Sequence, residues 1–300
     1  MKTITVFTPS YNRAHLLGRL YDSLLRQTCQ DFTWLVVDDG STDGTRELVA
    51  GWQAEGRIEI QYAYKSNGGM HTAHNRAYEL MRTELNVCID SDDWMPDNAV
   101  ERILSVWAKY RDDDDVVGLI GLDVDPNGNT IGSSLPADGT RATLGKLYQV
   151  HRCTGDKKLV YRNSVTASSP RFPEFKGEKL VPLSWLYTQI DQIGQLVTMN
   201  EPLIVVEYQA DGSSANVLKQ YFQSPRGFRA LREVNIRYAL SIGYRIKNII
   251  HYGFSSITAK DWSYFKHSPT PWGSLSTFPA SLVLYLLLRF RLGLLERSRS

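Results

Sequence analysis

Strand-like and helical sequence patterns alternate over the first 110 residues, and this alternation constrains the fold more than any other feature. Four short apolar runs predict strands at Ile4–Thr8, Phe32–Val37, Ile58–Tyr64 and Leu85–Ile89. A helical spacing of apolar residues follows each of them, at 16–25, 43–54, 71–81 and 98–110. Repeated β-α units favour a parallel sheet that helices cover on both faces. We therefore expect an α/β protein.

Polar clusters stand at the carboxyl ends of all four predicted strands. They are Thr8–Asn12, Asp38–Ser41, Lys65–Gly69 and Asp90–Asp93. Ligands of open α/β sheets bind beyond the carboxyl ends of parallel strands, which lie at one edge of the sheet. The four clusters therefore predict a single binding site at that edge.

The fourth cluster, Asp90-Ser91-Asp92-Asp93, follows an apolar strand directly. Asp90 and Asp92 can share one face, because side chains two residues apart in an extended chain point the same way. Mg²⁺ and Mn²⁺ prefer such oxygen ligands and leave coordination positions for substrate phosphates. An isolated cluster of this kind would favour a solvated acidic turn, but the three upstream clusters favour a metal site.

Several classes of protein are excluded by motifs that the chain lacks. The turn after the first strand, Thr8–Arg13, contains neither the GxGxxG of a dehydrogenase nor the GxxxxGK[ST] of a P-loop enzyme. A nucleotidyltransferase would need a basic phosphate-binding loop there, and Arg13 alone is a poor substitute. The three cysteines, Cys29, Cys88 and Cys153, form no CxxC pair and support neither a zinc site nor a disulfide framework.

Three motifs together resemble the family 2 glycosyltransferases of the GT-A fold. They are Thr8–Arg13, Val36–Thr45 and Ile89–Asp93, and the resemblance covers roughly Met1 to Val206. It implies a GT-A type, Rossmann-like mixed sheet covered by helices. It also implies a nucleotide-diphospho-sugar donor, Mn²⁺ or Mg²⁺ as cofactor, and inversion at the anomeric carbon. A UDP-sugar is what the family leads us to expect.

The resemblance assigns residues to the donor site position by position. Two of these positions match residues that pack on the base. Two more match a pair of acidic residues, one of which binds the base or the ribose. The other positions contact the base or the phosphates, or belong to a DxD-type motif. The donor-site residues are Pro9, Tyr11, Asp38, Asp39, Lys65, Asn67, Arg76, Asp90 and Asp92, and the metal ligands are Asp92 and Asp93. As alternatives, Tyr11 could cap the sheet, an aspartate of the second cluster could cap the next helix, and Lys65 could be a solvated charge.

The general base is expected in the segment 172–179, where the family usually has a Gly-Glu-Asp-like sequence. Glu178 matches that motif and is the preferred base, although Lys179 stands where many members have Asp. Asp191 is the fallback candidate and Glu174 the third. The alternative for Glu178 is an acid that stabilises a helix start through the helix dipole.

The last third of the chain differs from the rest in charge. Residues 211–300 carry thirteen Lys/Arg against four Asp/Glu, whereas residues 1–210 carry twenty-one against twenty-eight. We therefore expect a catalytic domain over 1–210 and a basic helical region over 211–300. The apolar run Phe278–Leu288, followed by Arg289, Arg291, Arg297 and Arg299, suits an interfacial helix on anionic lipid. The alternative is packing on the domain or in a homo-oligomer, and no nucleic-acid module is visible.

The remaining elements are predicted from shorter patterns. They are a hairpin over Leu122–Thr140, strands at Val116–Ile120, Lys158–Tyr161 and Leu203–Val206, a helix over Leu180–Met199, and mostly helical structure over Leu218–Tyr244. The first strand begins within Met1–Val6, which leaves no room for a secretory signal. We expect a protein on the cytoplasmic face of the membrane that transfers sugar from a nucleotide-sugar to a saccharide or lipid-linked acceptor in cell-surface polysaccharide synthesis. The alternative is a non-catalytic nucleotide-sugar-binding subunit of a membrane glycan-assembly complex.

Overall fold

The computed structural model describes residues 2–207 and 217–297, and the chain divides into two compact units. The first comprises Met1–Arg171 and Ile190–Gln209, and the second comprises Phe172–Gln189 and Ala210–Ser300. The domain boundary predicted near residue 210 lies outside the described residues. The segment Phe172–Gln189, which the sequence assigned to the catalytic domain, groups with the second unit.

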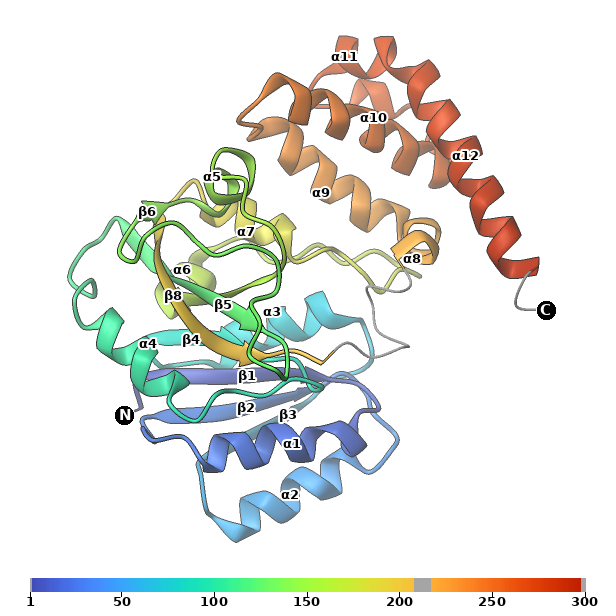
Figure 1. Ribbon diagram of the computed structural model, residues 1–300. Coiled ribbons are helices and arrows are strands. Elements are labelled where there is room, and N and C mark those ends of the chain that lie inside the picture. The colour runs from blue at the N-terminus through green and yellow to red at the C-terminus, as the bar shows by residue number, and fades with distance from the viewer. Residues whose placement is uncertain (1, 208–216, 298–300) are drawn as a thin grey trace. The chain divides into compact units, whose positions relative to one another are not determined.

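An eight-stranded mixed sheet forms the centre of the first unit (Figure 1). The strands are β1 (Ile4–Ser10), β2 (Phe32–Asp38), β3 (Ile60–Tyr64), β4 (Leu85–Cys88), β5 (Val116–Val124), β6 (Arg141–Ala142), β7 (Lys157–Arg162) and β8 (Gln195–Val205). Their order across the sheet is β3-β2-β1-β4-β7-β5-β8-β6. The first four strands are mutually parallel, as predicted, whereas β7 runs antiparallel to both of its neighbours, β4 and β5.

Helices cover both faces of the parallel half of the sheet. The helices of this unit are α1 (Ala14–Leu25), α2 (Thr45–Glu55), α3 (Met70–Leu80), α4 (Ala99–Trp107), α5 (Leu144–Gln149) and α6 (Asn163–Ser168). On one face, Tyr21 of α1 stacks on Trp52 of α2 and also lies over Trp34 of β2. On the other face, Phe7 of β1 contacts the rings of His74 and Tyr78 from α3. Burial on both faces explains why every residue of β1 and β2 is buried and why β2 is an almost continuous apolar run.

Two sequence predictions between residues 122 and 199 are wrong, wholly or in part. The predicted helix over Leu180–Met199 is confined to α7 (Ser184–Ile190), and the chain then enters β8. Gly194 fits closely at the junction, since an added Cβ would lie 2.5 Å from the Asp115 carbonyl oxygen. Residues 196–199 are all buried, and this part of β8 pairs with β5 on one side and β6 on the other. A short buried run shows no apolar-polar periodicity, so its sequence does not distinguish a strand from a helix.

The hairpin predicted over Leu122–Thr140 is only partly formed. A turn closes around Asp125, whose carboxylate accepts hydrogen bonds from the backbone N–H groups of Asn127 and Asn129, both at 2.9 Å. Beyond a single bridge between Val124 and Thr130, the chain leaves β5, and β6 pairs with β8 instead. The strong interactions of this turn are local, and they do not determine where the returning chain pairs.

The described residues of the second unit are mainly helical. Besides α7 they form α8 (Val217–Gln223), α9 (Pro225–Arg237), α10 (Ile242–Thr258), a 3₁₀ turn η2 (Tyr264–Lys266), α11 (Pro271–Ser276) and α12 (Phe278–Arg297). The predicted break near Ser224 is confirmed, because Pro225 begins α9. Helices α9 and α12 both pack on α10. No helix among the described residues is long and apolar enough to cross a membrane.

Candidate functional site

The loops that follow the parallel strands meet at one edge of the sheet, as predicted from the polar clusters. The Asp39 N–H donates to the Ser10 carbonyl at 2.8 Å, and the Lys65 N–H donates to the Asp38 carbonyl at 2.9 Å. The Asn12 N–H donates to Ser41 Oγ at 2.9 Å. These bonds join the loops after β1, β2 and β3 into one surface.

Asp39 is the structural centre of this surface. Its Oδ1 accepts from Lys65 Nζ at 2.6 Å and from the Gly68 N–H at 2.9 Å, and its Oδ2 accepts from the Gly69 N–H at 2.7 Å and from Asn67 Nδ2 at 3.1 Å. The carboxylate is 3 % exposed. Lys65 and Asn67, which were predicted to meet the nucleotide, are thus held by Asp39 and position the loop before α3. Asn67 Oδ1 is buried and has no hydrogen-bond partner among the described residues.

Asp38 is buried beside Asp39 but has different partners. Its Oδ1 accepts from the Ser41 N–H at 2.7 Å, and its Oδ2 accepts from the Tyr62 hydroxyl at 2.5 Å. Burial, together with the hydrogen bond to Asp38, raises the pKa of Tyr62 to about 12. Two donors leave lone pairs on this carboxylate available, so Asp38 can accept further hydrogen bonds, whereas Asp39 already accepts four.

The other donor-site candidates differ in their accessibility. Tyr11 is 48 % exposed at the end of β1 and can offer its ring to a planar ligand, while Pro9 is buried within the strand. Arg76 lies in α3, and its Nη1 forms an ion pair with Glu79 Oε2 at 2.9 Å. Its predicted diphosphate contact therefore competes with an existing partner.

Carboxylates gather where β4 and β5 end. Asp93 and Asp123 are 6 % and 3 % exposed, and Asp123 Oδ1 is buried without a hydrogen-bond partner in the described chain. Burial, reinforced by the neighbouring Asp90, raises the pKa of Asp93 to about 8. Burial likewise raises the pKa of Asp123 to about 6, against the attraction of Lys158. The pKa of Asp90 is also raised by burial, although Lys158 opposes the shift.

This set of side chains fits a hard divalent cation. Burial raises the pKa of Asp90 and Asp93 and so disfavours their ionised forms, which an added cation would favour, and carboxylate oxygens suit Mg²⁺ or Mn²⁺. Within residues 2–207 and 217–297, however, no group of three or more His, Cys, Asp or Glu side chains is arranged to hold a metal ion by itself. An ion bound by Asp92 and Asp93 would take its remaining ligands from water or substrate phosphates, as Mg²⁺ commonly does.

The preferred base, Glu178, is located in the second unit at the start of α9. Its Oε1 accepts from Arg226 Nε at 2.8 Å and from the Arg226 N–H at 3.1 Å, and its Oε2 accepts from the Gly227 N–H at 2.9 Å. Gly227 is needed for this close approach, because an added Cβ would lie 1.9 Å from the Leu180 carbonyl oxygen. Glu178 therefore caps a helix, which is the alternative role that the sequence offered, although for a different helix.

Asp191, the fallback base, also binds a helix start. Its two oxygens accept from the N–H groups of Leu144 and Gly145, at 2.8 and 2.7 Å, at the beginning of α5. Burial raises the pKa of Asp191 to about 6, although these two hydrogen bonds oppose the shift. The third candidate, Glu174, is exposed.

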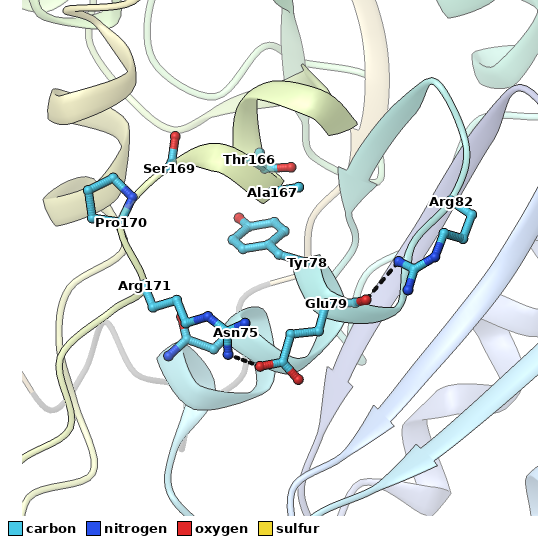
Figure 2. A pocket seen from close by; sticks show the side chains of 9 residues that line it. All are labelled: Asn75, Tyr78, Glu79, Arg82, Thr166, Ala167, Ser169, Pro170 and Arg171. Carbon is cyan, nitrogen blue, oxygen red and sulfur yellow. Dashed lines mark hydrogen bonds and ion pairs between the residues drawn. The ribbon is translucent and has the colours of Figure 1, made fainter.

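A pocket of 410 Å³ lies beside α3 and α6, lined by Asn75, Tyr78, Glu79, Arg82, Thr166, Ala167, Ser169, Pro170 and Arg171 (Figure 2). Glu79 is paired with Arg171, and its backbone carbonyl accepts from Arg82. Arg82 precedes β4, and α6 follows the end of β7 that pairs with Leu85. The pocket is therefore close to the start of β4, at the opposite end of that strand from Asp90.

Sequence reasoning missed two charged residues of the acid cluster, Asp123 and Lys158. Asp123 stands near the end of the apolar strand β5, as Asp90 follows β4, so the same signal was available. Lys158 was included in a predicted strand, but nothing local distinguishes it from its neighbour Lys157. Only the pairing of β7 with β4 and β5 brings it to the acids.

The chain is similar to known proteins in sequence and in fold. The family model described as glycosyl transferase family 2 matches residues 5–167. The chondroitin synthase of Pasteurella multocida is 32 % identical over 108 residues, which are 36 % of this chain and 11 % of that protein. The first curated relatives are longer: the matches cover from 11 to 39 % of their length.

Two solved structures share the fold. Residues 1–349 of TarS from S. aureus, in complex with UDP-GlcNAc, superpose with a TM-score of 0.64 at 16 % identity, covering 96 % of this chain and 81 % of that one. The mannosyltransferase PcManGT from Pyrobaculum calidifontis, in complex with GDP-Man and Mn²⁺, gives 0.56 at 19 % identity, with coverage of 96 % and 82 %. The expected GT-A fold is confirmed. Since the family model matches more than half of the sequence, this chain belongs to the family 2 glycosyltransferases.

Proposed function

We propose that this chain is an inverting glycosyltransferase that moves a sugar from a nucleotide-diphospho-sugar, a UDP-sugar, to a saccharide or lipid-linked acceptor. One observation carries the proposal: at the end of β4, in a chain of this family, lie carboxylates whose pKa is raised by burial. Two proteins of the same fold, both below 20 % sequence identity to this chain, have been solved with nucleotide-sugars: TarS with UDP-GlcNAc, and PcManGT with GDP-Man and Mn²⁺. Chondroitin and hyaluronan synthases among the relatives support a role in cell-surface polysaccharide synthesis.

The donor site uses the edge described above. Tyr11 offers an exposed ring for stacking on the base beside Pro9, and Asp38 has free acceptor capacity for a base N–H or a ribose hydroxyl. Asp39 supports the site indirectly by fixing Lys65 and Asn67. Asp90 is assigned to the ribose by its place in the DxD-type motif.

Asp92 and Asp93 are the proposed ligands of Mn²⁺ or Mg²⁺. The bound metal supplies positive charge to the departing diphosphate. Asp92 is more accessible than Asp93, so the two can present oxygens toward a substrate from one turn. Arg76 would need to leave Glu79 to reach the diphosphate.

Inversion follows from attack opposite the leaving group. The acceptor oxygen forms a bond to the anomeric carbon while the bond from that carbon to the phosphate oxygen breaks, and a carboxylate takes the acceptor proton. Glu178 is the proposed base by its place in the family motif, and Asp191, with a pKa of about 6, is the alternative. Both carboxylates now accept backbone N–H bonds, which hold them oriented but also compete with the proton.

The second unit offers a surface for a membrane. Helix α12 exposes Val283, Leu286, Leu287, Phe290 and Leu294, which recur at helical spacing on one face, with Arg289 and Arg291 beside them. Trp272 of α11 is 82 % exposed. Apolar and cationic groups together suit an anionic lipid surface, so we propose peripheral attachment on the cytoplasmic side. Arg299 lies outside the described residues, and contact with a second copy through this face is the alternative.

A non-catalytic, nucleotide-sugar-binding subunit is the second candidate, because both base candidates serve as helix caps. Donor hydrolysis and transfer with Mn²⁺, compared between the wild type and Asp92→Ala, separates the two. Turnover by the wild type that is lost in the variant supports the enzyme; donor binding without turnover supports the subunit. A thermal-shift screen of nucleotide-sugars with Mn²⁺ identifies the donor, and the absence of any shift contradicts both.

A further inference from the structure

Lys158 points toward the acid cluster from the middle of the sheet. Strand β7 lies between β4 and β5, and its Lys158 pairs with Gly121 of β5. Val160 pairs with Val87, so the antiparallel register places Lys158 beside the end of β4. There Lys158 Nζ donates to the Cys88 carbonyl at 3.2 Å.

The groups that interact electrostatically with Lys158 are mainly acidic. Burial by itself lowers the pKa of Lys158, but the carboxylates of Asp123, Asp90 and Asp93 more than offset this effect, and the net shift is upward. Asp123 stands two residues after the Gly121 partner, on the same face of β5. Its unpartnered, buried Oδ1 is consistent with attraction to Lys158 through space rather than a direct bond.

The neighbouring lysine has a different role. Lys157 Nζ donates to three backbone carbonyls, those of Ile131 and Thr154 at 2.9 Å and that of Asp156 at 3.1 Å. It therefore holds the loops before β6 and β7 together. Lys158 is the lysine that donates to the Cys88 carbonyl at the end of β4 and interacts electrostatically with the acids there and on β5.

We propose that Lys158 is a positioning residue that acts as a resident cation of the acid cluster, so that a divalent metal binds strongly only together with the donor's diphosphate. This inference rests on the proposed metal-dependent function. The Lys158 ammonium interacts electrostatically with Asp93, so it would repel a divalent ion that Asp93 binds. The negative charge of the diphosphate offsets that repulsion, and binding of metal and nucleotide becomes mutually dependent.

The test is direct Mn²⁺ binding, followed by paramagnetic resonance of the free ion with and without UDP. The wild type is expected to bind Mn²⁺ weakly alone and more tightly with UDP. Lys158→Met is expected to bind Mn²⁺ alone about tenfold more tightly and to lose most of the enhancement by UDP. Lys158→Arg keeps the charge and should resemble the wild type. Lys109→Met, on the exposed surface after α4, removes the same charge elsewhere and should change nothing.

If Lys158 had a purely structural role, its substitution would weaken metal binding. The direction of the change in Mn²⁺ affinity therefore distinguishes the two roles. Asp123→Asn removes an acid and should weaken Mn²⁺ binding severalfold, opposite to Lys158→Met. If Lys158→Met does not fold, Lys158→Gln provides the same comparison. Unchanged or weaker Mn²⁺ binding by a folded Lys158 variant overturns the inference while the proposed function stands. If the wild type fails to bind Mn²⁺ even with UDP, the metal-dependent function itself is wrong.

Discussion

Two groups of aspartates lie at the same edge of the sheet, and they differ in how many hydrogen-bond donors the protein provides to them. Asp39, after β2, accepts four hydrogen bonds, one of which is the ion pair with Lys65, and Asp38 accepts two. Asp93 and Asp123, after β4 and near the end of β5, are equally buried, but burial raises the pKa of each of them. Buried acids of similar appearance in the sequence thus serve different purposes.

The difference shows that buried carboxylates at one edge of a sheet can have two separate roles. A carboxylate whose lone pairs are filled by the protein fixes loops and has little capacity left for a ligand. A carboxylate that lacks donors is costly to keep ionised and gains most from an added cation. We therefore expect the first group to determine stability and the second to determine metal-dependent activity.

The strongest test of this division is Asp93→Asn. Loss of a metal ligand should lower the transfer rate by about 10³-fold. Because the pKa of Asp93 is about 8, the metal-free protein already holds this side chain largely protonated at neutral pH, so the Asn variant should unfold at nearly the same temperature as the wild type. Rate and melting temperature, measured without metal, provide the comparison, and a large loss of stability would contradict the division.

Asp39→Asn is expected to show the reverse pattern. The amide would replace one acceptor oxygen with a donor that faces other donors, and the Lys65 ammonium would lose its carboxylate partner. The expected cost is about 3 kcal/mol in the free energy of unfolding, measured with urea. Asp93→Asn is the matched control, and equal losses in the two variants would show that the two groups are not distinct.

The sequence could predict that a site lies at this edge of the sheet, but not which of its aspartates are held by the protein and which lack hydrogen-bond donors. Strand ends and acidic clusters are local signals, and they located all of the aspartates except Asp123. The partners that satisfy Asp39 come from residues about 30 positions away, which meet it only because β2 and β3 are paired. Glu178 was found by its motif, but the helix that it caps begins at Pro225, 47 residues later. Tertiary partners of this kind leave no local pattern.

The pH dependence of stability gives a smaller test, on Asp123. Its pKa is about 6 in the folded protein and about 3.9 in unfolded chains. Folding therefore favours the protonated form, and the stabilisation is complete below pH 4 and is lost as the pH rises through 6. Relative to Asp123→Asn, the wild type should lose on the order of 2 kcal/mol over this range. Urea unfolding of both proteins at pH 4.5, 6 and 7.5 measures the difference, and a constant difference would argue against a raised pKa for Asp123.

The smallest effect is expected on the satisfied side, at Tyr62. Its hydroxyl orients Asp38 through the 2.5 Å hydrogen bond, and Tyr62→Phe removes that donor without changing the packing of the ring. The loss should be about 1 kcal/mol of stability, because Asp38 keeps its bond from the Ser41 N–H. Tyr64→Phe on the same strand is the control, since Tyr64 is 51 % exposed beneath the Arg46 guanidinium. If Asp38 reads the donor, Tyr62→Phe should also raise the donor KM with kcat little changed, because a freely rotating carboxylate weakens ground-state and transition-state binding alike. A fall in kcat at constant KM would instead place Tyr62 nearer the reacting atoms than its strand position implies.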